Sequence, residues 1–293
     1  MSQQLKAGLM LLLIPILWGI TFPLMHIILA HLSANFFVFW RFLCAGILLL
    51  PIWFYAWRKK SLSIRDLRYG ILIALTNSGG YVFQGMALQH EDSARAAFVT
   101  GVNVILVPLL LPLFGMRRPR VLEIIAAIIC LGGIYIISGA NFDHVSYGDL
   151  LVFCSAIFIA LGIILVERAS SKSSNLQLLV FYQIIFTPVI PFLILKGDVL
   201  NFPHNMPLFW FAVIYCALVA TVIAIFLQLK YQSVIGSSKA AIIFNFEAIA
   251  ASFAAWMMGE SISENVLIGG VVIIFSAVLT DLYKLLKNFQ LNI

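Results

Sequence analysis

The chain has 293 residues, of which 62% are hydrophobic and 10% are charged, and its formal net charge is +6 at pH 7. A water-soluble domain of this length could not cover its surface with so few polar side chains, so the composition excludes that class. A bilayer core takes roughly 20 apolar residues per helix, and the chain is long enough for about ten such helices.

We therefore predict an all-α, polytopic membrane protein in which short polar or turn-rich connections, such as residues 58–61 and 170–174, separate the apolar stretches. The expected spans are residues 7–30, 36–57, 67–88, 94–114, 119–138, 147–166, 176–196, 206–230, 237–258 and 264–286. The first span follows a short head containing Lys6, and its length favours a retained helix over a cleaved signal peptide.

The basic residues predict the orientation. With the N-terminus inside, the inner connections receive every Lys and Arg except Arg41, Arg95 and Lys196. Cytoplasmic loops of membrane proteins collect Lys and Arg, so both termini are expected in the cytoplasm of a multi-pass protein of the cell inner membrane. The net positive charge then matches contact with anionic membrane lipids, and nucleic acid is an unnecessary partner.

An internal repeat divides the chain. The segment from Ser93 to Gly115 is echoed 144 positions later by the segment from Ser237 to Gly259. A division near residues 141–148 gives two halves of five spans, residues 1–140 and 147–287. Because five is odd, two halves of one fold must lie inverted relative to each other in the membrane. We predict two inverted five-helix repeats.

Several short motifs resemble one known family. Trp18-Gly19-Ile20-Thr21-Phe22-Pro23 is similar to a W-G-x-x-F-P signature of the drug/metabolite transporter superfamily, in its ten-helix EamA-type branch. The resemblance extends through Arg41-Phe42-Leu43, Leu48-Leu49-Leu50-Pro51, residues 96–108, Gly259-Glu260 and Leu267-Ile268-Gly269-Gly270. Two features depart from the family pattern: no acidic residue follows Gly115, and the proline of the fourth and ninth helices is displaced to Pro108 or replaced at Ala248.

This resemblance implies two inverted bundles around a central cavity, lined mainly by helices three, four, eight and nine. At about 1.5 Å per residue, Asn103 and Glu247 both fall near the membrane midplane. Glu247 is the first candidate for proton coupling, or for pairing with a cationic group of the substrate. The alternatives are a structural ion pair with Arg41 or hydrogen bonds to a neighbouring helix. For Asn103, bonding between helices competes with cavity lining.

The other candidates are deep polar or aromatic side chains. Arg41 lies too far inside its span to be a helix-end residue, and it suits either substrate binding or a structural salt bridge. The full set of substrate-binding candidates is Trp18, Arg41, Tyr81, Gln84, Asn103, Gln183, Gln228, Asn245 and Glu247. The aromatic side chains expected to wall the cavity are Trp18, Phe22, Tyr81, Tyr182 and Phe244.

Other chemistry has little support in the sequence. The four cysteines lie apart within predicted spans, and we interpret His90-Glu91-Asp92 as a solvated outer turn, so no metal and no cofactor are expected. A G-x-x-x-x-G-K-[ST] motif is absent, which excludes ATP hydrolysis by this chain.

We therefore predict a secondary transporter that is not an enzyme and that moves a small metabolite by alternating access. An amino acid or related zwitterion is favoured as substrate, export is favoured as direction, and proton coupling is open. The alternatives are efflux of drugs or cations, a facilitated carrier, and, remotely, an intramembrane enzyme or a channel. Faces of small residues such as Ala250 and Ala251 leave a homodimer open.

Overall fold

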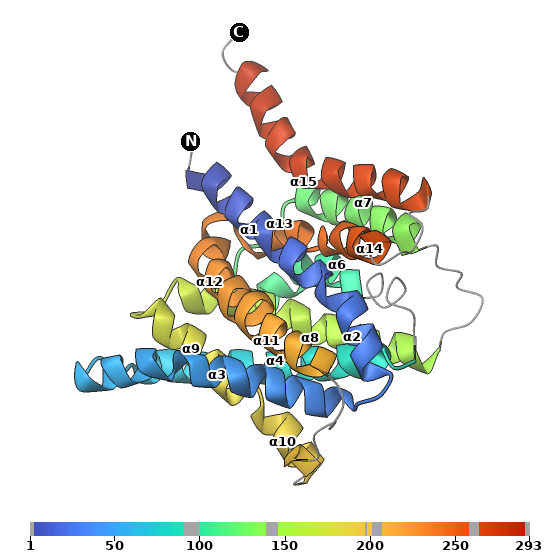
Figure 1. The fold of residues 1–293 in the computed structure, drawn as a ribbon. Helices are drawn as coiled ribbons and strands as arrows, with labels where there is room; N and C mark the ends of the chain where they lie inside the picture. The colour runs from blue at the N-terminus through green and yellow to red at the C-terminus, as the bar shows by residue number, and fades with distance from the viewer. Residues whose placement is uncertain are drawn as a thin grey trace.

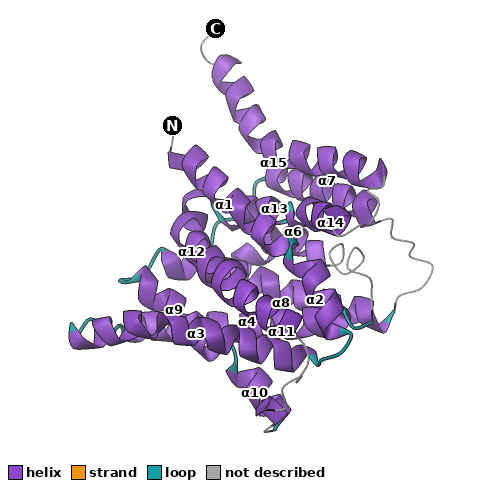
Figure 2. Cartoon of the chain, in the orientation of Figure 1, coloured by secondary structure: helices purple, strands orange, loops and turns teal. Residues whose placement is uncertain are grey.

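The computed structural model describes residues 3–90, 100–138, 146–196, 198–200, 207–257 and 264–290. All regular secondary structure in these ranges is helical (Figure 2). Five described segments are long and apolar enough to cross a membrane, namely Gln3–Leu29, Ala34–Arg58, Tyr147–Ser170, Leu176–Leu195 and Pro207–Ile235. The all-α membrane fold is thereby confirmed.

Each of the ten predicted spans contains at least one described helix (Figure 1). The first half holds α1 (Gln3–Gly19), α2 (Thr21–Leu29), α3 (Ala34–Arg58), α4 (Ile64–Ala87), α6 (Asn103–Leu110), the 3₁₀ turn η1 (Leu111–Phe114) and α7 (Val121–Ser138). The second half holds α8 (Tyr147–Ser170), α9 (Leu176–Phe186), α10 (Val189–Leu195), the 3₁₀ turn η2 (Asp198–Leu200), α11 (Pro207–Ala217), the π-helical segment η3 (Leu218–Ile223), α12 (Ala224–Ile235), α13 (Ser237–Phe244), α14 (Glu247–Met257) and α15 (Glu264–Gln290).

Several spans that we expected to be single helices are interrupted. The first breaks at Ile20 between α1 and α2, and the ninth breaks at Asn245 and Phe246 between α13 and α14. The seventh breaks at Thr187 and Pro188, where proline has no N–H to donate and its ring crowds the preceding turn. At two of these breaks a side-chain hydroxyl donates to a backbone carbonyl: Thr21 Oγ1 to Trp18, and Ser78 Oγ to Thr187.

Helices of the two halves interleave. α4 packs along α8 and α9, α1 along α12 and α14, and α7 along α15 (Figure 1). Glycines permit the close approach at two of these contacts. A Cβ added at Gly79 of α4 would lie 2.6 Å from the Phe158 ring of α8, and one at Gly133 of α7 would lie 2.8 Å from the Gly269 carbonyl oxygen of α15. Packing therefore accounts for both glycines.

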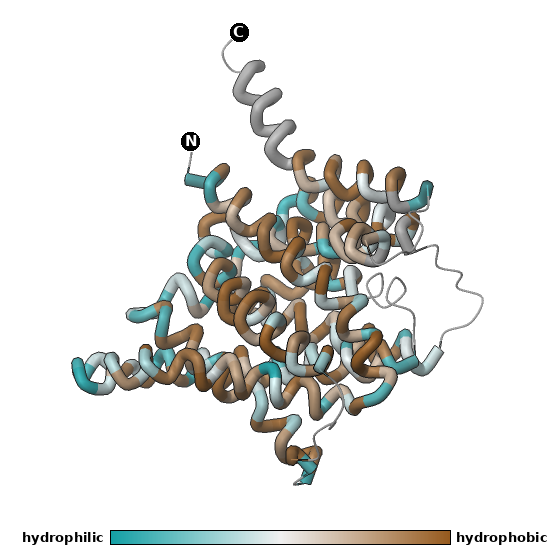
Figure 3. Tube along the Cα trace, in the orientation of Figure 1, coloured by the Kyte–Doolittle hydropathy of each residue, from teal (hydrophilic) through white to brown (hydrophobic). Residues whose placement is uncertain are grey.

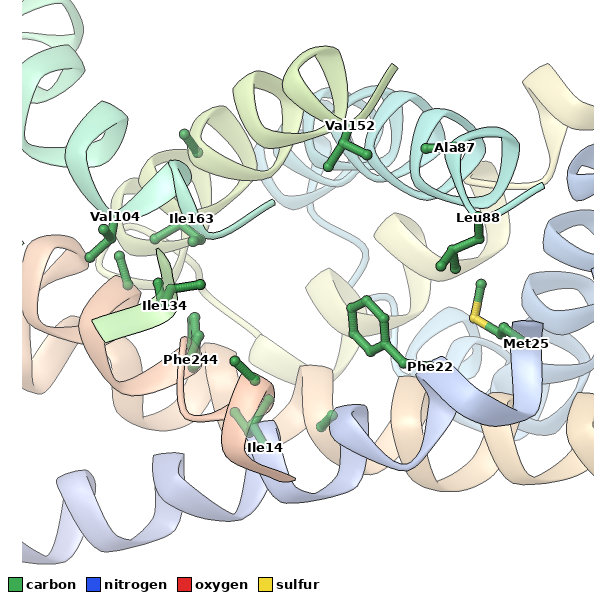
Figure 4. Close-up of a cluster of buried hydrophobic side chains, with 14 of the residues drawn as sticks. Ile14, Phe22, Met25, Ala87, Leu88, Val104, Ile134, Val152, Ile163 and Phe244 are labelled. Atoms are coloured by element: carbon green, nitrogen blue, oxygen red, sulfur yellow. The ribbon is translucent and has the colours of Figure 1, made fainter. Parts of the chain in front are cut away.

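The buried apolar side chains form a core shared by both halves. In Figure 4, Met25 and Leu88 face each other at one end, Phe244 and Ile134 lie at the other, and the Phe22 ring points into the space between them. Hydrophobic residues dominate the helices, whereas polar residues gather at connections such as that between α3 and α4 (Figure 3). This pattern suits helices surrounded by lipid.

Candidate functional site

An internal cavity of about 850 Å³, including its mouth, lies among helices of both halves. Its lining side chains are Trp18, Thr21, Phe22, Arg41, Thr76, Asn77, Gly80, Tyr81, Gln84, Thr100, Asn103, Ile159, Gly162, Ile163, Val166, Gln183, Ile225, Gln228, Phe244, Asn245 and Glu247. All nine substrate-binding candidates from the sequence are in this set, so the fold brings them to one cavity.

Of the five aromatic side chains expected to wall the cavity, four line it and one does not. Trp18, Phe22, Tyr81 and Phe244 line the cavity, but Tyr182 does not. Tyr182 is buried in a separate apolar cluster, where its Cβ would lie 2.3 Å from a Cβ added at Gly70. Its neighbour Gln183 does reach the cavity, because successive residues of a helix point in directions about 100° apart.

Arg41 is held by the π-helical segment η3. Its Nε donates to Thr221 Oγ1 at 2.8 Å, and an Nη donates to the Ala220 carbonyl at 3.2 Å. Its guanidinium carbon also lies 4.6 Å from the centre of the Tyr81 ring, in cation–π geometry. A π-helical turn shifts the backbone hydrogen-bond register, and such turns are frequent at functional sites. Here the segment offers a carbonyl and a hydroxyl to a buried cation.

Trp18 donates to the same carbonyl group as Arg41. Its Nε1 donates to the Ala220 oxygen at 2.8 Å, and its ring lies 5.5 Å from the ring of Phe244. The next residue, Gly19, lies against α14: a Cβ added there would be 2.5 Å from the Ala250 Cβ. The Trp18-Gly19 pair thus anchors the end of α1 to η3, α13 and α14 of the second half.

Glu247 is the first residue of α14, directly after the break in the ninth span. Within the described residues, the Glu247 carboxylate has neither an ion pair within 4 Å nor a hydrogen bond, and Arg41 is occupied by η3. The structure therefore lacks the direct Arg41–Glu247 ion pair that the sequence left as an alternative. A helix start favours a negative charge, so the position can hold a carboxylate.

Amide side chains complete the polar lining. The Nδ2 groups of Asn103 and Asn245 donate to carbonyls of their own segments, Thr100 at 2.8 Å and Ala241 at 2.9 Å. Asn103 Oδ1, Asn77 Nδ2 and Gln183 Nε2 are buried without a partner among the described residues. Because unpartnered buried polar atoms are costly, these three atoms suit hydrogen bonds with a ligand or water in the cavity.

A buried hydrogen-bond chain leads from the cavity to one end of the bundle. Gln228 Nε2 donates to Gln232 Oε1 at 2.9 Å, and Gln232 Nε2 donates to Ser237 Oγ at 3.2 Å and to the Ile163 carbonyl at 2.5 Å. The Ser237 N–H then donates to Glu167 Oε2 at 2.6 Å. This inner network, Gln228, Gln232, Ser237 and Glu167, joins α12 and α13 to α8.

Sequence reasoning missed Thr21, Thr76 and Thr100, which also line the cavity. The sequence argument selected amide and charged side chains that lie deep in the predicted spans. A threonine in an apolar helix is a weaker signal, because it commonly bonds to its own backbone, as Thr76 does to the Ile73 carbonyl at 2.8 Å. Of the His90-Glu91-Asp92 cluster, only His90 lies within the described residues. Those residues contain no cluster of three metal-ligating side chains.

Comparison with known proteins extends over nearly the whole chain. The model of the EamA-like transporter family matches residues 5–139 and again residues 146–281. An uncharacterized transporter of Archaeoglobus fulgidus is 28% identical over 96% of this chain and 87% of its own length. The uncharacterized transporter YyaM of Bacillus subtilis is 24% identical over 93% of this chain and 92% of its own.

A solved crystal structure, described only as that of a protein, shares the fold. It superposes with a TM-score of 0.74 over 96% of this chain and 98% of the other, at 15% sequence identity.

Proposed function

The chain belongs to the EamA-like transporter family, and from this premise we propose that it is a secondary transporter that exports an amino acid or related zwitterion by alternating access. The observation that carries the substrate class is the placement of Arg41 and Glu247 in one cavity without an ion pair between them. A cation and an anion held apart can each meet the opposite charge of a zwitterion, while the amides bind its remaining polar groups.

Glu247 is the proposed proton carrier. A carboxylate inside the hydrocarbon layer costs roughly 2.5 kcal/mol or more unless it is solvated, paired or protonated. Substrate and proton can therefore compete for the same group: the carboxylate binds the ammonium of the substrate, and it takes a proton after the substrate leaves. Such exchange at one carboxyl group couples the two movements.

Alternating access is supported by the way the two halves meet. The cavity takes lining residues from both predicted repeats, 1–140 and 147–287, which we propose lie inverted around it. The inner network joins α12 and α13 to α8 and crosses the predicted cytoplasmic side of the cavity. We propose that this network breaks when the cavity opens toward the cytoplasm.

One observation favours efflux of organic cations as a second candidate function. The Glu247 carboxylate shares the cavity with the aromatic rings of Trp18, Phe22, Tyr81 and Phe244, a combination that suits a desolvated cation. The positive charge of Arg41 in the same cavity opposes this candidate.

We also propose that the protein resides in the cell inner membrane with both termini in the cytoplasm. A homodimer stays a prediction.

The proposal is tested in proteoliposomes with a mixture of L-amino acids as the probe. Glu247→Gln is expected to abolish uptake driven by a proton gradient while exchange between labelled and unlabelled substrate persists. Glu264→Gln, at the exposed start of α15, is the matched control and should leave both intact. Proton-driven uptake that survives in Glu247→Gln would exclude Glu247 as the carrier, and uptake of organic cations in place of amino acids would select the second candidate.

A further inference from the structure

A second hollow lies on the outside of the bundle, away from the cavity, between the beginning of α4 and the end of α8. Its lining residues are Ile64, Arg65, Arg68, Tyr69, Leu72, Phe114, Leu165 and Arg168, and its volume is about 1140 Å³ including the open mouth. We call it the α4–α8 groove. Three of its residues are arginines, none is acidic, and the remaining five are apolar or aromatic.

The acidic neighbours of these arginines face elsewhere. Asp66, next to Arg65, accepts hydrogen bonds from Ser174 Oγ at 2.8 Å and from the Asn175 N–H at 3.2 Å. Glu167, next to Arg168, accepts the hydrogen bond from the Ser237 N–H at 2.6 Å. In both adjacent pairs the carboxylate binds the start of another helix, and the arginine is left at the groove.

The arginines keep most of their donors. Arg65 donates to the Lys172 carbonyl at 3.5 Å, and Arg168 donates to the Phe114 carbonyl. Within the described part of the chain, none of the three arginines is within 4 Å of a carboxylate. A guanidinium has five N–H donors in a planar fork that matches a phosphate group. The groove thus holds a cluster of positive charge whose donors suit an anion with several oxygen atoms.

Two apolar residues of the groove, Leu72 and Leu165, lie on the membrane side of the charges. Leu72 follows Arg68 by one helical turn into α4, and Leu165 precedes Arg168 by about one turn in α8. Leu72 is 47% exposed, as expected for a side chain that faces lipid. Positive charge at a helix end, with an apolar wall one turn deeper, matches the two parts of a phospholipid.

We propose that the α4–α8 groove is a binding site for an anionic phospholipid. The phosphate lies among Arg65, Arg68 and Arg168, and an acyl chain lies along Leu72 and Leu165. The site joins α4 of the first half to α8 of the second. A bound lipid therefore stabilises the arrangement of the two halves seen in this structure.

The test uses the full chain purified in a neutral detergent and measures lipid binding by native mass spectrometry. Phosphatidylglycerol is compared with phosphatidylcholine of the same acyl chains, and inorganic phosphate is added as a soluble competitor. The variants are Arg65→Gln with Arg68→Gln, and Leu72→Gln. Lys230→Gln is the matched control, because Lys230 is exposed on the same predicted side but packs over the rings of Phe226 and Tyr231.

The wild-type chain should prefer phosphatidylglycerol. The double arginine variant should bind it about 25-fold more weakly, on the order of fivefold for each arginine. Leu72→Gln should also weaken binding, and Lys230→Gln should not. Equal binding of the two lipids by the wild-type chain, or an equal loss in Lys230→Gln, would overturn the proposal. Displacement of the lipid by millimolar inorganic phosphate would overturn it as well, since the site would then recognise the free anion.

Discussion

α4 and the run α11–η3–α12 are the third helices of the two predicted repeats, yet only one of them is regular. α4 is continuous from Ile64 to Ala87, whereas the second-half counterpart contains the π-helical segment Leu218–Ile223. At the repeat offset of 144 positions, Ala220 and Thr221 correspond to Thr76 and Asn77. In α4 these positions offer side chains to the cavity; in η3 they hold Arg41 and Trp18.

The fourth helices of the two predicted repeats differ in charge instead. Asn103 begins α6 and Glu247 begins α14, so each stands at the start of a helix after a break in its span. The two residues have the same position relative to the backbone, but Asn103 is a neutral amide and Glu247 is ionisable. The two predicted repeats thus share a common frame, while the π-helical segment η3 and the ionisable Glu247 belong to the second.

Arg41→Ala should give the largest loss of stability. It leaves the Ala220 carbonyl with only the Trp18 donor and removes the partner of Thr221, which should destabilise the fold by about 2–4 kcal/mol. Thermal unfolding of the detergent-purified protein measures this loss. Thr221→Val removes one of the same bonds and should cause a smaller loss. A wild-type melting temperature in Arg41→Ala would show that η3 does not depend on this contact.

Gly19→Ala should have the next largest effect, because it disturbs the contact between α1 and α14. The new Cβ would lie 2.5 Å from the Ala250 Cβ and 2.7 Å from the backbone nitrogen of Ala251, so α1 and α14 must move apart, at a cost of about 1–3 kcal/mol. Gly8→Ala is the control in the same helix, where no atom lies within 4 Å of the added Cβ. Equal melting temperatures for the two variants would contradict the close contact.

Disruption of the inner network should have an effect of similar size. Gln232→Leu removes the bonds to Gln228, Ser237 and Ile163, and it should lower stability by about 1–3 kcal/mol because buried partners lose their bonds. Labelling of a cysteine introduced at Gln228 should also become faster from the predicted inner side in this variant. Unchanged labelling would argue against a closing role for the network.

Asn103→Ala should have the smallest effect and so sharpen the contrast with Glu247. The side chain donates only to the Thr100 carbonyl of its own segment, so its loss should change stability by about 1 kcal/mol. Transport in proteoliposomes should keep its proton dependence and show a higher KM. Loss of proton coupling in Asn103→Ala would remove the proposed asymmetry between the two repeats.

Much of this arrangement was predictable from the sequence. Composition and hydrophobic runs predicted the ten helices, and the depth of polar residues in those runs found Arg41, Asn103 and Glu247 in the cavity. Pro188 offered a signal for the break between α9 and α10. The π-helical segment had no such signal, because Leu218–Ile223 contains neither glycine nor proline; Arg41 and Trp18, distant in sequence, bond to it. Likewise, the sequence did not show that Arg41 bonds to Thr221 and Ala220 and leaves Glu247 without an ion pair among the described residues.

The most direct test of the central claim, that this cavity binds the substrate through two separated charges, is a thermal-shift screen of the purified protein against amino acids, organic cations and organic anions. Arg41→Gln is used with Glu247→Gln, because glutamine keeps donors near Thr221 and Ala220 while removing the charge. We predict that amino acids raise the melting temperature of the wild-type chain and of Glu264→Gln, and that this rise is smaller in both cavity variants. An undiminished rise in both cavity variants would contradict this prediction.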